Sequence, residues 1–195
     1  MPSTTAQSSR TSAAASPTTA TSAITQSQLK SALLAVTALP TGWSTTPPST
    51  DKKTPCNQPS VTKAVPPAAT AEADFVMGTD VPFFGDILNA YSDAATAGRA
   101  FDKYQSVTSA CTSYNQDGVK VDIGQLSVPS LGDRSIGYRL TLSQGGSSVV
   151  LDNEFIQRGE VIVFVGYGDL TADTQQLATF SKLAYDKAVR TLHLS

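Results

Sequence analysis

Residues 149–167 read VVLDNEFIQRGEVIVFVGY, two strand-like segments separated by Arg158-Gly159. A short glycine-containing turn between two such segments predicts a hairpin of antiparallel strands. The second segment is apolar at five consecutive positions, from Val161 to Val165. A strand that lacks polar alternation is typically covered on both faces, so we expect residues 160–167 to lie near the centre of a sheet.

Further strands are predicted on the N-terminal side of this hairpin. Alternating apolar side chains, with turns at Asp117-Gly118 and Gly145-Gly146, predict strands within residues 111–143. The alternation changes phase at Gly124, which predicts a β-bulge. Earlier in the chain, residues 73–78 and 86–92 also have the composition of strands. Because hairpins of this length join antiparallel strands, we predict an antiparallel sheet.

Three amphipathic segments predict helices. Apolar residues recur at helical spacing in residues 26–37, after Thr25 as N-cap, in residues 93–110, and in residues 172–192, after Thr171 as cap. Helices at both ends of a chain whose strands cluster late indicate an α+β fold. The expected architecture is a central antiparallel β-sheet flanked by about three helices, with one disulfide.

Charge and composition argue against nucleic-acid binding and against a membrane-spanning helix. The chain has 195 residues, a formal net charge of −2 and only 15% charged residues, so much of its polarity comes from Ser, Thr, Gln and Asn. No basic stripe is present, and we therefore expect no nucleic-acid partner. No apolar run reaches the roughly 18 residues that a membrane-spanning helix needs.

The N-terminal segment differs from the rest of the chain. Residues 1–24 are rich in Ser, Thr, Ala and Pro, which predicts a disordered leader, and residues 25–195 then form a single α+β domain. Leaders of this kind often separate a folded domain from a lipid anchor or a membrane helix. We expect that a signal peptide has been removed, and that any membrane association came through a lost N-terminal anchor.

Cys56 and Cys111 are the two cysteines, so one internal pairing is possible. An exported protein favours the disulfide, whereas two buried free thiols are the alternative. The bond would restrain the Pro-rich residues 44–71, which are long for a structureless segment inside a compact domain. Long loops of this kind are often functional, and we regard this one as the candidate rim of a site.

No constellation of residues predicts catalysis or metal binding. The one histidine, His193, is the third residue from the C-terminal end, where a general base is hard to position. Asp152 and Glu154 share one side of a strand, as carboxylates of a glycoside hydrolase could, but we expect that strand to be exposed and the spacing to be ordinary. Without a set of suitable ligands, we expect neither a metal nor a cofactor.

Aromatic residues are the candidate ligand contacts. Trp43 is the only tryptophan and could wall a pocket or anchor the core beneath the first helix. The adjacent pair Phe83-Phe84 is expected in a loop, where two neighbouring side chains rarely both bury, although packing in the core or loop is the alternative. The candidate ligand-binding residues are Trp43, Phe83, Phe84, Tyr91 and Tyr167.

The chain resembles a family of actinobacterial exported proteins. The resemblance rests on LPTGWS at residues 39–44, on Cys56 in the Pro-rich segment, on Ala73 and Phe75 in an A-x-F strand, and on the Ala-rich segment 94–111 ending in a cysteine. The family comprises lipoproteins and the extracellular sensor domains of mycobacterial receptor-type serine/threonine kinases. It implies an antiparallel sheet flanked by helices, with a cleft for an unidentified ligand and no catalytic residue. The kinase members have two disulfides, so the resemblance favours the lipoprotein branch.

These observations favour a non-catalytic ligand-binding or sensing module of the cell envelope. We expect it at the cell surface as a membrane-anchored lipoprotein, bound to a small molecule, lipid, glycan or envelope protein. A lipid or glycolipid carrier is the first alternative and would need an enclosed apolar cavity. A carboxylate-based hydrolase and a protein–protein scaffold are the others.

Overall fold

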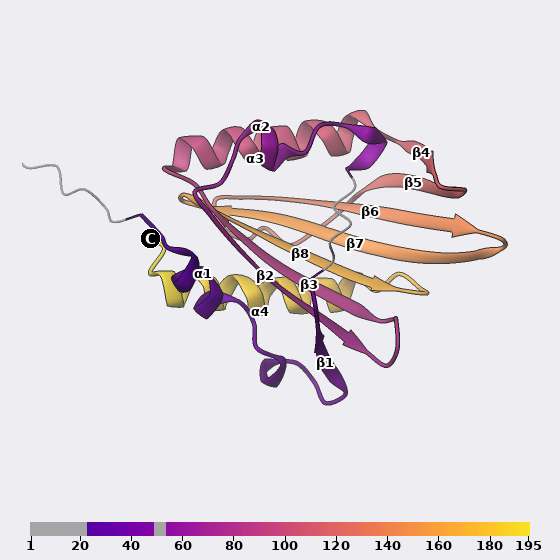
Figure 1. The fold of residues 1–195 in the computed structure, drawn as a ribbon, viewed down its shortest axis with the longest axis horizontal. Helices are drawn as coiled ribbons and strands as arrows, with labels where there is room; N and C mark the ends of the chain where they lie inside the picture. The colour runs from indigo at the N-terminus through magenta and orange to yellow at the C-terminus, as the bar shows by residue number, and fades with distance from the viewer. Residues whose placement is uncertain (1–22, 49–53) are drawn as a thin grey trace, which may run out of the picture.

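The computed structural model describes residues 23–48 and 54–195. Within these ranges the chain forms one eight-stranded antiparallel sheet with helices on both faces (Figure 1). The predicted α+β class, the antiparallel sheet and the Cys56–Cys111 disulfide are confirmed. The predicted leader lies outside the described residues except for its last two positions, of which Ile24 packs against the core.

The elements follow one another along the chain with these bounds. The strands are β1 Trp43–Thr46, β2 Ala69–Met77, β3 Phe83–Ala90, β4 Ser113–Gln116, β5 Val119–Leu126, β6 Arg134–Gln144, β7 Ser147–Arg158 and β8 Val161–Asp169. The helices are α1 Gln26–Ala32, α2 Val61–Ala64, α3 Ala94–Ala110 and α4 Thr174–Leu192, with short 3₁₀ turns at Val36–Ala38 and Pro55–Asn57.

The apolar strand β8 lies inside the sheet, as its sequence predicts. The strand order is β1-β2-β3-β8-β7-β6-β5-β4, so β8 pairs with β3 on one side and β7 on the other. Val161, Val163 and Val165 belong to one buried cluster, and Ile162 belongs to a second cluster on the opposite face. The sheet therefore separates two cores, and β8 contributes to both.

Each face of the sheet has its own helices. We call the face covered by α1 and α4 the α4 face, and the face covered by α2 and α3 the α3 face (Figure 1). Trp43 belongs to the core of the α4 face, where its ring centroid lies 5.5 Å from that of Phe180. Phe84 packs on the same Phe180 ring at 4.7 Å.

The first predicted helix is too long. Thr25 and Gln28 form the expected capping box, but α1 ends at Ala32 and Leu33 is extended. The chain leaves the helix because the Leu34 N–H donates a hydrogen bond to the Asp86 carboxylate at 2.9 Å. Leu34 and Asp86 are 52 residues apart, so the local spacing of apolar residues does not reveal this hydrogen bond.

The last predicted helix begins too early. Residues 172 and 173 are not helical, and Asp173 rather than Thr171 caps α4 by accepting a hydrogen bond from the Gln176 N–H at 2.9 Å. The second predicted helix, by contrast, has the expected bounds within one residue and is capped by Asp93.

The predicted bulge at Gly124 is wrong, since β5 pairs with β6 without interruption from Lys120↔Ser143 to Leu126↔Gly137. The phase of the apolar pattern changes because the strand contributes to both cores. Ile123 packs on the α3 face, whereas Leu126 points to the α4 face and joins the core there.

Candidate functional site

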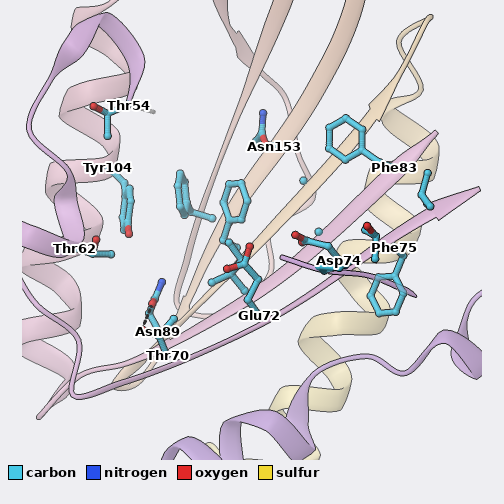
Figure 2. Close-up of a pocket in the computed structure, with 18 of the residues that line it drawn as sticks. Thr54, Thr62, Thr70, Glu72, Asp74, Phe75, Phe83, Asn89, Tyr104 and Asn153 are labelled. Carbon is cyan, nitrogen blue, oxygen red and sulfur yellow. Dashed lines mark hydrogen bonds between the residues drawn. The ribbon is translucent and has the colours of Figure 1, made fainter. Parts of the chain in front are cut away.

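A cavity of about 740 Å³ opens on the α3 face of the sheet (Figure 2). Side chains of β2, β3, β7 and β8 line it, together with Tyr104 of α3 and residues that precede and begin α2. Its volume lies within the range of about 300–1,000 Å³ that is typical of ligand sites. The elements that enclose it are far apart in sequence, so only the strand register brings them together.

The floor of the cavity is one row of residues across six neighbouring strands. Directly opposite one another, from β1 through β2, β3, β8 and β7 to β6, are Thr46, Asp74, Gly85, Gly166, Asn153 and Tyr138. Every member of this row lines the cavity. Directly opposed residues in a sheet point to the same face. The row therefore places polar side chains on both sides of the two glycines, with Thr46 and Asp74 on one side and Asn153 and Tyr138 on the other.

Gly85 and Gly166 leave a gap in this floor, which we call the glycine notch. A Cβ atom on Gly85 would lie 3.1 Å from Asp74 Oδ1, and a Cβ atom on Gly166 would lie 3.1 Å from Asn153 Oδ1. Neither glycine has a positive φ, so their backbones do not require glycine. The absence of side chains lets the Asp74 carboxylate and the Asn153 amide lie close to the floor, where even a Cβ atom at either glycine would crowd them.

The amide of Asn153 has a fixed orientation. Its Nδ2 donates a hydrogen bond to the Leu151 carbonyl at 3.1 Å, which leaves Oδ1 on the side of Gly166. The acceptor oxygen thus faces the notch before any ligand is present, and no rotation of the side chain is needed to present it.

Aromatic rings form the remaining walls. Phe155 stacks on Tyr104 with ring centroids 4.1 Å apart, and Phe164 lies 4.8 Å from Phe155. On the other side of the notch, the Phe83 ring lies over Gly168, where a Cβ atom would come within 2.1 Å of its Cε1. Burial raises the pKa of Tyr104 and of Tyr138, so both phenols stay neutral and can donate as well as accept hydrogen bonds.

The Pro-rich segment forms the rim. Thr46, Pro47, Thr54, Ser60 and Thr62 line the cavity, and the functional role of residues 44–71 stays a prediction. The segment is not structureless, because it contains most of β1, the 3₁₀ turn Pro55–Asn57, α2 and the first residues of β2. Residues 49–53 of it lie outside the described part of the chain.

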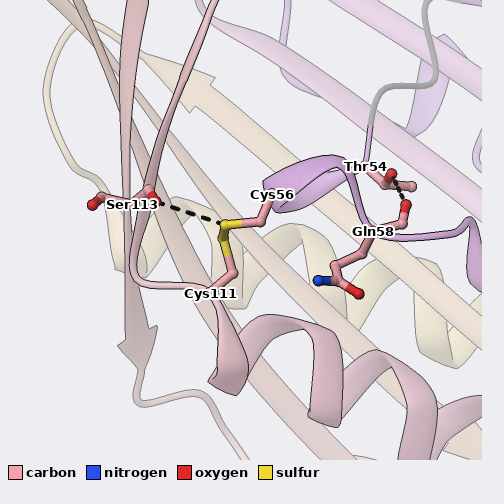
Figure 3. The surroundings of a disulfide bond; sticks show 5 residues. All are labelled: Thr54, Cys56, Gln58, Cys111 and Ser113. Carbon is pink, nitrogen blue, oxygen red and sulfur yellow. Dashed lines mark hydrogen bonds between the residues drawn. A yellow bond between two sulfur atoms is a disulfide. The ribbon is translucent and has the colours of Figure 1, made fainter.

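A disulfide attaches this rim to the end of α3. The Cα atoms of Cys56 and Cys111 are 6.0 Å apart, and Cys56 Sγ lies 3.7 Å from the Ser113 carbonyl oxygen (Figure 3). Thr54 donates a hydrogen bond to the Gln58 carbonyl across the turn that carries Cys56. The Cys56–Cys111 disulfide thereby joins the rim to the end of α3, the helix that supplies Tyr104.

The residues predicted to bind ligand lie on both faces of the sheet. Phe83 lines the cavity. Trp43, Phe84 and Tyr167 are buried in the α4-face core instead, since neighbours in a strand such as Phe83 and Phe84 point to opposite faces. Tyr91 is buried on the α3 face beside Tyr104, outside the lining of the cavity. Phe83-Phe84 is therefore a strand pair and not the expected loop pair, and the ligand role of these five residues stays a prediction.

The sequence interpretation missed Asp74, Gly85, Asn153 and Gly166. A glycine inside a strand weakens it unless another group needs the space, so Gly166, inside the predicted strand 160–167, was an available signal. Gly85 gave no such signal, because it precedes the predicted strand 86–92. The pattern does not show that the two glycines are opposed, because register between distant strands cannot be read from either segment alone.

Asp152 and Glu154 lie in a buried strand, and the expectation of an exposed one is wrong. Asp152 is 1% exposed and accepts two hydrogen bonds from Arg139, at 2.6 and 2.8 Å. Glu154 is fully buried on the α4 face near Ser181 of α4, and burial raises its pKa to about 7. Neither carboxylate lines the cavity.

Three further features of the described residues are relevant to function. No grouping of three or more His, Cys, Asp or Glu side chains suited to a metal ion occurs in residues 23–48 and 54–195. None of the helices described there has the length and apolarity to cross a membrane. His193 ends α4 in a left-handed conformation with a φ of 54°.

Comparison with known proteins gives a likeness of fold. No family model matches the chain, and no curated protein matches it. Among solved structures, the chain is similar to the extracellular domain of PknH from Mycobacterium tuberculosis, with a TM-score of 0.62 and 11% sequence identity over 88% of this chain and 98% of that chain. The chain therefore shares the fold of this mycobacterial extracellular domain, as the sequence resemblance implies.

Proposed function

We propose that the chain is an extracytoplasmic ligand-binding module of the cell envelope, with the cavity on the α3 face as its ligand site. The observation that carries the proposal is the six-strand row, every member of which lines the cavity, with Asp74 and Asn153 on either side of Gly85 and Gly166. Glycine is unfavourable inside a strand, and here the two opposed glycines accommodate the Asp74 and Asn153 side chains, whose oxygens we propose as ligand contacts at the floor of the cavity.

Two observations support a location outside the cytoplasm. The fold is similar to that of the extracellular domain of PknH, and the Cys56–Cys111 disulfide suits an oxidising compartment. In this proposal a lipid anchor attached to the N-terminal side holds the module at the cell surface, and the Ser/Thr-rich segment that precedes Ile24 acts as the spacer.

The lining of the cavity favours binding over catalysis. Its described residues contribute carboxylates, amides, hydroxyls and aromatic rings, without a histidine or cysteine. The histidine of the chain, His193, ends α4 on the opposite face of the sheet. The mixture of polar and aromatic groups also suits a soluble polar ligand better than the acyl chain of a lipid carrier.

A cavity-filling variant tests the proposal. Ligand-observed NMR with a library of several hundred soluble fragments would be run on the protein, on Gly166→Val and on Gly124→Val. Gly124 is the matched control because it also lies in a strand, and a Cβ atom there would meet nothing within 4 Å.

We expect a set of fragments that bind the protein and Gly124→Val but not Gly166→Val. Fragments that bind all three proteins equally, or none of them, would contradict the assignment of the cavity as the ligand site. Circular dichroism of each variant would establish that all three are folded.

A further inference from the structure

We infer that the ligand of this cavity is a saccharide, bound with one pyranose ring above the glycine notch; this inference rests on the proposed function. The argument comes from the chemistry of the four groups that surround the notch, which are Asp74, Asn153, Phe83 and Phe164.

The two ends of the notch offer planar polar groups. Asp74 and Asn153 lie on opposite sides of the glycine pair, each with an oxygen 3.1 Å from the point that a side chain at the nearer glycine would occupy. Carboxylate and carboxamide groups have two hydrogen-bonding atoms in one plane. Because Asn153 Nδ2 is bonded to the Leu151 carbonyl, its Oδ1 can accept a hydrogen bond from one ring hydroxyl, and an Asp74 carboxylate oxygen can accept one from a hydroxyl at the opposite edge of the ring.

The other two sides of the notch are aromatic. Phe164 Cε1 and Cζ lie 3.5 Å from the Cβ position of Gly166, and the Phe83 ring covers the neighbouring Gly168. Both rings are partly exposed and border the cavity. A pyranose ring has apolar C–H faces and a polar hydroxyl edge, and it therefore matches a site that is aromatic on two sides and polar on the other two.

The outer part of the cavity continues the same chemistry. Hydroxyl side chains are frequent on its rim and along β2, at Thr46, Thr54, Ser60, Thr62 and Thr70. Tyr104 and Tyr138 add neutral phenols next to Phe155. Short hydroxyl side chains donate and accept hydrogen bonds with little loss of side-chain entropy, as a ligand with many hydroxyls requires. The volume, about 740 Å³, leaves space beyond the notch for further sugar residues.

The experiment combines saccharides with two non-saccharide probes. Fluorescently labelled full chain would be applied to a glycan array that carries bacterial and other oligosaccharides, and the strongest hits would be titrated by NMR. Choline and octanoate serve as probes for an organic cation and an acyl chain. The variants are Gly166→Val, Asn153→Leu and Phe83→Ala, with Gly124→Val as the control.

We expect saccharide binding that is lost in Gly166→Val, weakened at least tenfold in Asn153→Leu and in Phe83→Ala, and unchanged in Gly124→Val. If no glycan binds while fragments, choline or octanoate bind in a manner that depends on Gly166, the saccharide assignment is wrong and the proposed function stands. If nothing binds in a Gly166-dependent manner, both are wrong. Glycans that bind Gly166→Val as well as the unmodified protein would place the saccharide site elsewhere and overturn the inference.

Discussion

Asp86 of β3 and Glu154 of β7 lie on either side of Val165 of β8, in one row of the sheet beneath α4. Both carboxyl groups are completely buried. Burial raises the pKa of Asp86 to about 7, although the Leu34 N–H and Lys187 favour its charged form, and burial also raises the pKa of Glu154 to about 7. The core of the α4 face thus contains two groups that exchange protons near neutral pH.

We predict that the protein becomes less stable as the pH rises from about 4 to about 7. In the unfolded chain both carboxyl groups ionise near pH 4, so over this interval the native state binds more protons than the unfolded state. The free energy of unfolding then falls with pH, and the fall ends above the native pKa values. Urea denaturation at pH 5, 6, 7 and 8, followed by the fluorescence of Trp43, measures the profile.

Replacement of one acid isolates its contribution. Glu154→Gln should flatten the profile and make the protein more stable than the unmodified one at pH 8, by roughly 1–3 kcal/mol. The control is Asp122→Asn, which removes an exposed pair with Lys120 and should change stability by no more than about 1 kcal/mol. A profile that is equally steep in Glu154→Gln and in the unmodified protein would contradict the assigned role of Glu154.

The strands could be predicted because their signals are local. Turn dipeptides such as Asp117-Gly118 and Gly145-Gly146 have positive φ angles, as expected from their sequence, and each lies between two paired strands. The central position of β8 follows from its apolar residues alone. The Cys56–Cys111 disulfide could be predicted because the chain has two cysteines, which allow one internal pairing, and because an exported protein favours that pairing.

The errors arise where a distant residue decides the local structure. Leu33 leaves the helix because Asp86, 52 residues beyond Leu34, accepts the Leu34 N–H. The notch needs Gly85 and Gly166 in one register, which depends on pairing between segments about 80 residues apart. Aromatic character made Phe83 and Phe84 equal candidates for ligand contact. Only their positions in β3 distinguish them, because neighbours in a strand point to opposite faces: Phe83 faces the cavity and Phe84 faces the α4-face core.

Gly132 occupies a position that we predict to be intolerant of any side chain. Its φ is 65°, and a Cβ atom would lie 2.3 Å from the Gln157 carbonyl oxygen. Gly132→Ala should therefore destabilise the protein by about 3 kcal/mol, through backbone strain and steric overlap. Gly159→Ala is the matched control: its φ is 53° but the Cβ position is open, so only a strain of about 1 kcal/mol applies. Equal losses in urea denaturation of the two variants would show that the contact with Gln157 is unimportant.

Trp43 and Phe83 should respond to substitution in opposite ways. Trp43 packs on Phe180 in the α4-face core, so Trp43→Phe should lower stability by about 1–3 kcal/mol and leave the binding of cavity ligands unchanged. Phe83 is partly exposed at the cavity, so Phe83→Ala should weaken binding at a smaller cost in stability. Thermal unfolding and NMR titration with the same fragment measure both quantities. Loss of binding in Trp43→Phe would assign Trp43 to the ligand site after all.

The disulfide should matter both for stability and for the rim. Its cysteines are 55 residues apart, so the double variant Cys56→Ser/Cys111→Ser should lose about 4 kcal/mol of unfolding free energy in the chain-entropy model. Because Thr54 and Ser60 line the cavity close to Cys56, the variant should also bind cavity ligands more weakly under conditions where it is still folded. The control is the unmodified protein in the same buffer with and without reductant, which should reproduce both effects. Unchanged affinity in a folded, reduced protein would show that the rim keeps its position without the bond, and that the disulfide stabilises the fold alone.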